Sequence, residues 1–242
     1  MGRVMLVTSG KGGTGKSTVA LNLALSLAKE GGKTVLLEMD SGLRCLDLML
    51  GIDGIVYDLG DVLRGACNVQ QAVYPALQGV SLVAAAAEVG FLPDRERLSQ
   101  LCRYLAGQYD FVIMDTPAGL GKMLDTAAAA ADEALIVTNL TPVSVRDAEK
   151  AADQLGACGL KQRRLIINRV PKKTPYPREI MDADDIIDRV GTQLIAIVPE
   201  DPVLQQAAHL RTVRDSKGSL ALEVFERLAK RLCGQDVPLL IQ

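Results

Sequence analysis

Short runs of apolar, β-prone residues recur along the chain, and stretches with helical periodicity lie between them. The runs are Val4–Thr8, Val35–Met39, Val80–Val83, Phe111–Met114, Ala134–Thr138, Leu165–Ile167 and Leu194–Val198. Helices are predicted over Ser17–Glu30, Pro93–Ala106, Val143–Leu155 and Ser219–Leu232, because each ends one or two residues before a glycine. This alternation indicates βα units and an α/β fold, with a mostly parallel central sheet flanked by helices in three layers.

The same pattern predicts where function should lie. Ligands of open parallel sheets bind beyond the carboxyl ends of the strands, so the residues just after each run are the candidates. We expect one domain across residues 1–242, since that length suits a single α/β sheet and no repeat or Ser/Gly linker divides the chain. Three prolines within residues 171–178 exclude a helix or a central strand there.

Composition narrows the classes of function. The chain has 27 basic and 29 acidic residues, so no overall charge attracts polyphosphate and no specific nucleic-acid binding is expected. The five cysteines form no C-x-x-C motif and the single His209 has no ligand partner nearby, which argues against a zinc site or a metal-cluster carrier. Without a signal sequence or a membrane span, we expect a cytoplasmic protein, at most peripheral at the inner face of the membrane.

One motif carries specific chemistry. Gly10-Lys11-Gly12-Gly13-Thr14-Gly15-Lys16-Ser17 matches the phosphate-binding loop G-x-x-x-x-G-K-[ST] and lies between a predicted strand and a predicted helix. Glycines let backbone N–H groups surround an anion, and the helix N-terminus adds its positive dipole end. We expect ATP and Mg²⁺ as cofactors, with nucleotide contacts from Gly10, Lys11, Gly12, Gly13, Thr14, Gly15, Lys16, Ser17 and Thr18.

The second lysine makes the motif more specific. K-G-G-T-G-K-S resembles the deviant Walker A motif of the MinD/ParA family of dimeric P-loop ATPases. The similarity continues through residues 38–47, 55–58, 70–72, 111–119, 145–147 and 198–201, and there it is to MinD-like members in particular. The resemblance implies a P-loop NTPase fold and an ATP-dependent homodimer in which Lys11 reaches the phosphates bound by the other subunit.

Acidic residues at two strand ends complete the predicted catalytic site. Asp115 follows Phe111–Met114 and is placed to hold Mg²⁺ opposite Ser17, although a helix N-cap would explain the same carboxylate. The resemblance implies that Asp40 positions the attacking water or the metal shell and that the Gly119 N–H lies near the γ-phosphate. The predicted catalytic residues are Lys11, Lys16 and Asp40, and the predicted metal ligands are Ser17, Asp40 and Asp115.

The adenine site is predicted from two later segments. Asn168-Arg169 follows another apolar run, and the resemblance suggests that the Asn168 amide reads the adenine edge, since an amide both donates and accepts. Asn168 would equally satisfy a turn. Pro199, Glu200 and Asp201 are expected to line the other side of the base.

These expectations combine into a regulatory ATPase. The resemblance implies a MinD-like cycle between monomer and ATP dimer, in spatial control of cell-division site placement, with protein partners of the MinC or MinE type. Two alternatives stay open: a ParA-like ATPase that partitions DNA or other cargo, and a non-hydrolysing, nucleotide-gated adaptor.

The sequence departs from the family in two places. Glu38 stands where the family usually has Asp, so we leave it outside the predicted site. MinD proteins end in a basic amphipathic helix that lies on the membrane, whereas here only a short, largely uncharged segment follows Leu232. Because the apolar face of the helix Ser219–Leu232 is assigned to the core, we expect little membrane association.

Overall fold

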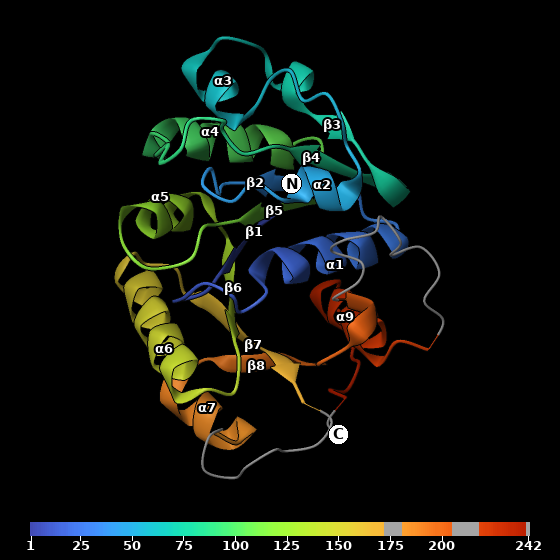
Figure 1. Ribbon diagram of the computed structural model, residues 1–242, viewed down its shortest axis with the longest axis vertical. Helices are drawn as coiled ribbons and strands as arrows, with labels where there is room; N and C mark the ends of the chain where they lie inside the picture. The colour runs from blue at the N-terminus through green and yellow to red at the C-terminus, as the bar shows by residue number, and fades with distance from the viewer. Residues whose placement is uncertain (172–180, 205–217, 241–242) are drawn as a thin grey trace.

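A central sheet of eight strands organises the computed structural model, which describes residues 1–171, 181–204 and 218–240. The strand order is β3-β4-β2-β5-β1-β6-β7-β8, and every pairing is parallel except that of β3 with β4 (Figure 1). The strands are β1 Arg3–Thr8, β2 Thr34–Glu38, β3 Tyr74–Pro75, β4 Val80–Val83, β5 Phe111–Asp115, β6 Glu133–Thr138, β7 Gln162–Val170 and β8 Gln193–Pro199.

Helices cover both faces of this sheet. α1 (Lys16–Lys29) and α9 (Leu220–Leu232) pack on one face, and α4 (Arg95–Ala106), α5 (Lys122–Ala130), α6 (Pro142–Ala157) and α7 (Ala183–Val190) pack on the other (Figure 1). The chain segment that connects β2 to β4 contains two short helices, α2 (Leu46–Leu50) and α3 (Leu59–Arg64). It also contains β3 and the 3₁₀ turns Val69–Ala72 and Leu77–Gly79. The predicted three-layer architecture is confirmed.

The strands are apolar throughout because both faces are buried. In β1, Met5 and Val7 join the core beneath α1 and α9, whereas Val4 and Leu6 join the core beneath the other helices. Such two-sided burial is typical of parallel strands and explains why the runs in the sequence do not alternate with polar residues. The scarcity of aromatic residues fits this arrangement, since aliphatic and alanine side chains fill both layers.

The sequence located all seven parallel strands but placed some boundaries wrongly. The run predicted at Leu165–Ile167 extends over Gln162–Val170, so Asn168 and Arg169 lie inside β7 rather than after it. The short elements β3, α2 and α3, and also α5 and α7, were missed. The predictions for the proline-rich segment beyond Pro171 and for His209 fall outside the described residues.

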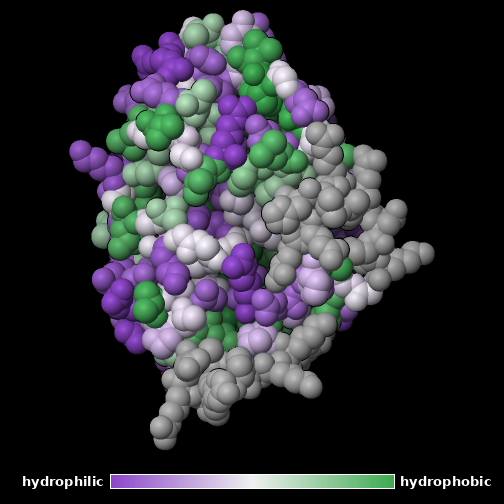
Figure 2. Space-filling view, in the orientation of Figure 1, coloured by the Kyte–Doolittle hydropathy of each residue, from purple (hydrophilic) through white to green (hydrophobic). Residues whose placement is uncertain are grey.

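Two further features concern the hydrophobicity of the surface and of the helices. On the face seen in Figure 2, hydrophobic residues form separate patches among polar ones. Within the described ranges, no helix is both long enough and apolar enough to span a bilayer.

Candidate functional site

The glycine-rich loop lies at the carboxyl end of β1 and leads directly into α1. Gly13 and Gly15 have φ values of 80° and 92°, in the left-handed region that favours glycine. At Gly10 a Cβ atom would lie 2.0 Å from the backbone oxygen of Asp147, so the loop is packed closely against α6. Gly12 and Gly13 are exposed, which leaves that part of the loop open to a ligand.

The start of α1 has free hydrogen-bond donors. Its N-cap is Gly15, and no side chain caps the first turn. The N–H groups of a helix's first turn have no partner within the helix, so they are available to an anion here. The expected cradle for phosphate is therefore present in the backbone.

Lys16 brings a positive charge to this cradle. Its side chain is buried, and burial lowers the pKa of the ammonium below its ordinary value, while the nearby carboxylates of Asp115 and Asp40 oppose that shift. A buried cation is costly unless an anion accompanies it. A bound phosphate group would supply that anion.

Asp115 is the most buried carboxylate of the candidate site apart from Glu38. Only 1% of the residue is exposed, and burial raises the pKa of this carboxyl to about 7, although a hydrogen bond with Ser17 and the charge of Lys16 act in the opposite direction. Its Oδ1 atom is buried without a hydrogen-bond partner. An unpartnered carboxylate oxygen beside a serine hydroxyl suits a magnesium ion, which prefers oxygen ligands and usually has only one or two carboxylates.

The structure thus brings together Ser17, Asp115 and Lys16, all predicted site residues. Asp40 lies nearby after β2, where its Oδ1 accepts hydrogen bonds from the backbone N–H groups of Gly42 (3.2 Å) and Leu43 (3.1 Å). Across the described part of the chain, no three His, Cys, Asp or Glu side chains are arranged to hold an ion by themselves. The metal role of Asp40 stays a prediction.

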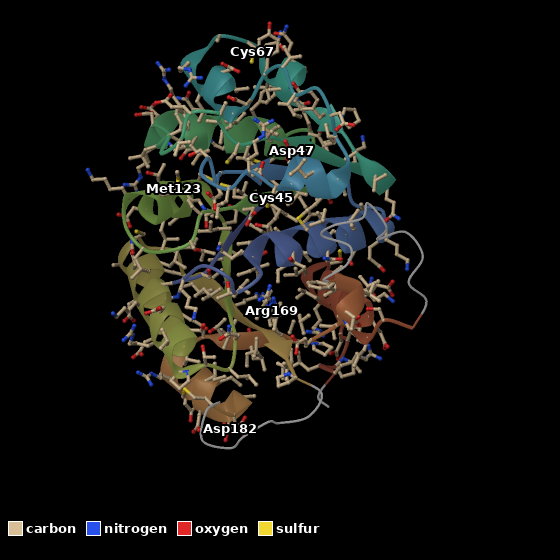
Figure 3. All side chains as sticks on the ribbon, in the orientation of Figure 1. Cys45, Asp47, Cys67, Met123, Arg169 and Asp182 are labelled. Carbon is tan, nitrogen blue, oxygen red and sulfur yellow. The ribbon has the colours of Figure 1, made fainter. Side chains whose placement is uncertain are left out.

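Two residues of this region were missed as site components. Glu38, paired with Asp115 across β2 and β5, accepts hydrogen bonds from the backbone N–H groups of Cys45 (2.7 Å), Leu46 (2.8 Å) and Ala85 (3.3 Å). It therefore ties the start of α2 to the segment just after β4. The second residue is Cys45, at the start of α2 (Figure 3): burial raises the pKa of its thiol to about 11, and a hydrogen bond with Ser17 opposes that rise.

The longer Glu38 side chain has a clear structural reason. The comparison with the family's motif showed that position 38 usually holds Asp, and this departure was the one sign in the sequence that Glu38 has a special role. What the sequence lacked was the position of α2, whose N-terminal N–H groups are the ones the carboxylate binds.

Gly119 lies in the loop between β5 and α5. Its backbone N–H donates to the carbonyl of Ser9 at 3.1 Å, so in this structure it is engaged by the loop that precedes the glycine motif. A γ-phosphate contact through this N–H would require that bond to be exchanged. The role of Gly119 stays a prediction.

The predicted adenine residues lie on β7, at the last residue of β8 and just after β8. The buried Asn168 amide donates from Nδ2 to the backbone oxygen of Thr14 at 2.8 Å, which links β7 to the glycine-rich loop. Arg169, also in β7, has a φ of 56°, and its side chain lies close to Gly15 at the start of α1 (Figure 3). Adenine recognition by these residues stays a prediction.

The segment after β8 is held by its own contacts. Pro199 ends β8, and the exposed Glu200 donates its backbone N–H to the Val170 oxygen at 2.7 Å. Both carboxylate oxygens of Asp201 accept hydrogen bonds, from the Val203 N–H at 2.8 Å and from the Ser219 hydroxyl at 2.9 Å. Asp201 thereby ties this turn to the N-cap of α9.

A parallel sheet, a strand–loop–helix phosphate cradle and a buried lysine beside a strand-end aspartate define a P-loop nucleoside triphosphatase. Residues 2–157 match the family described as AAA domain. The septum site-determining protein MinD of Synechocystis is 36% identical in sequence to this chain, and the match covers 99% of this chain and 92% of the Synechocystis protein. The chain belongs to the MinD family, within the MinD/ParA group of P-loop ATPases.

Solved structures of this family have the same fold. A chain of the MinC:MinD cell division protein complex of Aquifex aeolicus has a TM-score of 0.87 and 31% identity, with 99% of each chain covered. The septum site-determining protein MinD of Pyrococcus horikoshii, solved with Mg-ADP, has a TM-score of 0.81 and 30% identity, with 96% of each chain covered. The predicted family and fold are confirmed.

Proposed function

We propose that the chain binds MgATP at residues 10–18 and hydrolyses it slowly, as a dimerising regulatory ATPase in the placement of the division site. The carrying observation is the buried Lys16 beside Asp115, whose Oδ1 has no partner, at the open end of the glycine-rich loop. The similarity to septum site-determining MinD proteins supports the septum-site role over the ParA-like alternative. The relative solved with Mg-ADP supports the choice of cofactor.

Each residue has a defined task in this proposal. The loop N–H groups and Lys16 bind the phosphates, while Ser17 and Asp115 hold Mg²⁺, which would neutralise phosphate charge. Asp40 orients the attacking water, and positioning with charge neutralisation supplies most of the rate enhancement. Asn168, Arg169 and Pro199–Asp201 surround the base.

The ATP-dependent change from monomer to dimer is the regulatory step. Lys11 is only half-buried and lies beside the exposed Gly12, so its side chain is available to a neighbouring molecule. Large apolar residues are exposed after four strands, beyond their carboxyl ends, where Lys11 also lies: Leu43 (76%), Val89 (79%), Leu120 (47%) and Val143 (50%). Exposed large apolar residues on the side of the molecule that carries the phosphate loop favour a protein interface there. ATP favours the dimer because the phosphate contact of Lys11 exists only there.

A partner of the MinC kind fits this cycle. One similar structure is a MinC:MinD complex, so a relative of this chain assembles with such a protein. In this proposal the ATP dimer presents the partner surface and hydrolysis removes it.

The test measures nucleotide affinity by calorimetry and turnover by phosphate release. Lys16→Ala should lose ATP binding, whereas Lys29→Ala, a matched change at the exposed end of the same helix, should keep it. Asp40→Ala should bind ATP but release phosphate at least about tenfold more slowly. Equal turnover with and without Asp40 would favour the non-hydrolysing adaptor, and unchanged binding by Lys16→Ala would refute the phosphate site.

A further inference from the structure

The loop between β5 and α5 is anchored at both ends. At its start, the Thr116 N–H and hydroxyl both donate to the Val7 oxygen, at 3.3 and 3.0 Å. At its end, both backbone groups of Gly121 bind the Gln154 side chain. Between these anchors, Gly119 makes its single backbone bond to Ser9.

Gln154 holds Gly121 with a two-sided amide contact. Its Oε1 accepts from the Gly121 N–H at 3.1 Å, and its Nε2 donates to the Gly121 oxygen at 3.0 Å. Nε2 also donates to Asp125 Oδ1 at 2.6 Å. Only a side-chain amide offers an acceptor and two donors in this arrangement, so no other residue type of this size replaces it.

The position held by this contact is a backbone hinge. Gly121 has φ 109° and ψ −156°, a region that is essentially restricted to glycine, and it is the N-cap of α5. Gly119 also has a positive φ, of 105°. The loop thus contains two glycines at which its backbone direction can change, and one of them is fixed from outside.

The fixing residue comes from a helix that also contacts the phosphate loop. Gln154 lies on α6, beside α5 (Figure 1), and the same helix packs its Asp147 backbone against Gly10. One rigid element therefore touches the glycine-rich loop at one point and the end of the β5–α5 loop at another.

We propose that Gln154 is a positioning residue that holds the backbone hinge at Gly121 in place. With this hinge fixed, the Gly119 N–H exchanges its hydrogen bond to the Ser9 carbonyl for one to the γ-phosphate. This inference rests on the proposed ATPase function. The Gln154 amide touches neither the phosphate loop nor the predicted metal ligands, so its loss affects turnover rather than nucleotide binding. A γ-phosphate contact made mainly in the transition state changes kcat more than KM.

The experiment compares Gln154→Leu with the wild-type chain. Leucine keeps a similar volume and removes all three hydrogen bonds. We expect ATP and ADP affinities within about twofold of wild type, an unchanged KM and a kcat about tenfold lower, the size expected for a lost set of positioning bonds. Hydrogen exchange over residues 117–120 should differ between ADP and a non-hydrolysable ATP analogue in the wild type, and this difference should shrink in the variant.

Two further variants guard against a general loss of structure. Gln100→Leu removes an exposed side-chain bond to Glu96 on α4 and should leave kcat unchanged. Gln154→Glu should lower kcat, and adding Asp125→Asn, which restores a donor opposite the new carboxylate, should recover part of it. This rescue also keeps the test valid if Gln154→Leu fails to fold.

The outcomes separate the two proposals. A wild-type kcat in Gln154→Leu would overturn the positioning role. So would an equal loss of nucleotide affinity and kcat that the double variant Gln154→Glu/Asp125→Asn does not rescue. If the wild-type chain neither binds nor hydrolyses ATP, the proposed function itself fails, and the positioning role fails with it.

Discussion

Replacing Gly15 by alanine should destabilise the nucleotide-free fold more than the same replacement at Gly13. Both residues have a left-handed φ, and that conformation costs an L-residue about 1–2 kcal/mol. The two positions differ in their surroundings. A Cβ on Gly13 meets nothing within 4 Å, whereas a Cβ on Gly15 would lie 2.4 Å from Nδ2 of Asn168.

The extra cost at Gly15 can be worked out from the bond that must break. Asn168 has to move away, which removes its 2.8 Å bond to the Thr14 oxygen. A buried hydrogen bond of this kind contributes about 1 kcal/mol, so Gly15→Ala should cost about 2–3 kcal/mol against about 1–2 for Gly13→Ala. The entropic gain from replacing glycine in the unfolded chain is the same for both and cancels in the comparison.

Urea unfolding without nucleotide measures both costs directly. A third variant, Asn168→Ala, removes the side chain that the new Cβ would meet, so the double variant Gly15→Ala/Asn168→Ala should be more stable than the sum of the two single changes predicts. Equal destabilisation by the two glycine replacements, or strict additivity in the double variant, would refute the packing of Asn168 on the glycine-rich loop.

Three other perturbations test separate parts of the structure. The folded pKa of Asp115 is raised to about 7, above its ordinary value of 3.8, so its contribution to stability is present below pH 4 and is lost as the pH rises towards 7. Without Mg²⁺, this loss lowers the free energy of unfolding of the wild-type chain by up to about 4 kcal/mol at pH 8, and Asp115→Asn should remove it. If the melting temperature of the variant followed the same pH profile as that of the wild type, the raised pKa of Asp115 would be contradicted. The nearly buried Glu133 pairs with Arg3 (3.3 Å) and Arg164 (3.4 Å) at the amino ends of three neighbouring strands, β6, β1 and β7, so Glu133→Ala should cost about 2–3 kcal/mol in chemical unfolding, and a cost below about 0.5 would count against a structural role. Glu38→Asp shortens the carboxylate that holds the start of α2, so hydrogen exchange at that helix should speed up by about tenfold, and unchanged protection would exclude the capping role.

The architecture was predictable because its signals are local. Continuous apolar runs such as Phe111–Met114 identify strands buried on both faces, and Gly31 marks the end of α1, the first long helix. The phosphate loop is contiguous in sequence, so its motif alone places Lys16 and Ser17 at the start of α1. Short helices such as α2 escaped because five residues carry too little periodicity to be recognised.

The contacts that shape the site were not predictable, since they join distant parts of the chain. Asn168 bonds to Thr14 across 154 positions, which requires β7 to extend past the apolar run that marked it. Gln154 bonds to Gly121, which is 33 positions away, and no motif contains both residues. Such contacts depend on helix positions that only tertiary packing determines.

In the proposed mechanism, two copies of this chain share MgATP, and Lys11 of each contacts the nucleotide of the other. Light scattering of the wild-type chain and of Lys11→Ala, each with ADP and then with MgATP, tests it most directly. The wild-type chain should double its mass only with MgATP, while Lys11→Ala should stay monomeric and still bind nucleotide. A wild-type chain that stays monomeric with saturating MgATP, or a Lys11→Ala variant that dimerises as well as wild type, would contradict the claim.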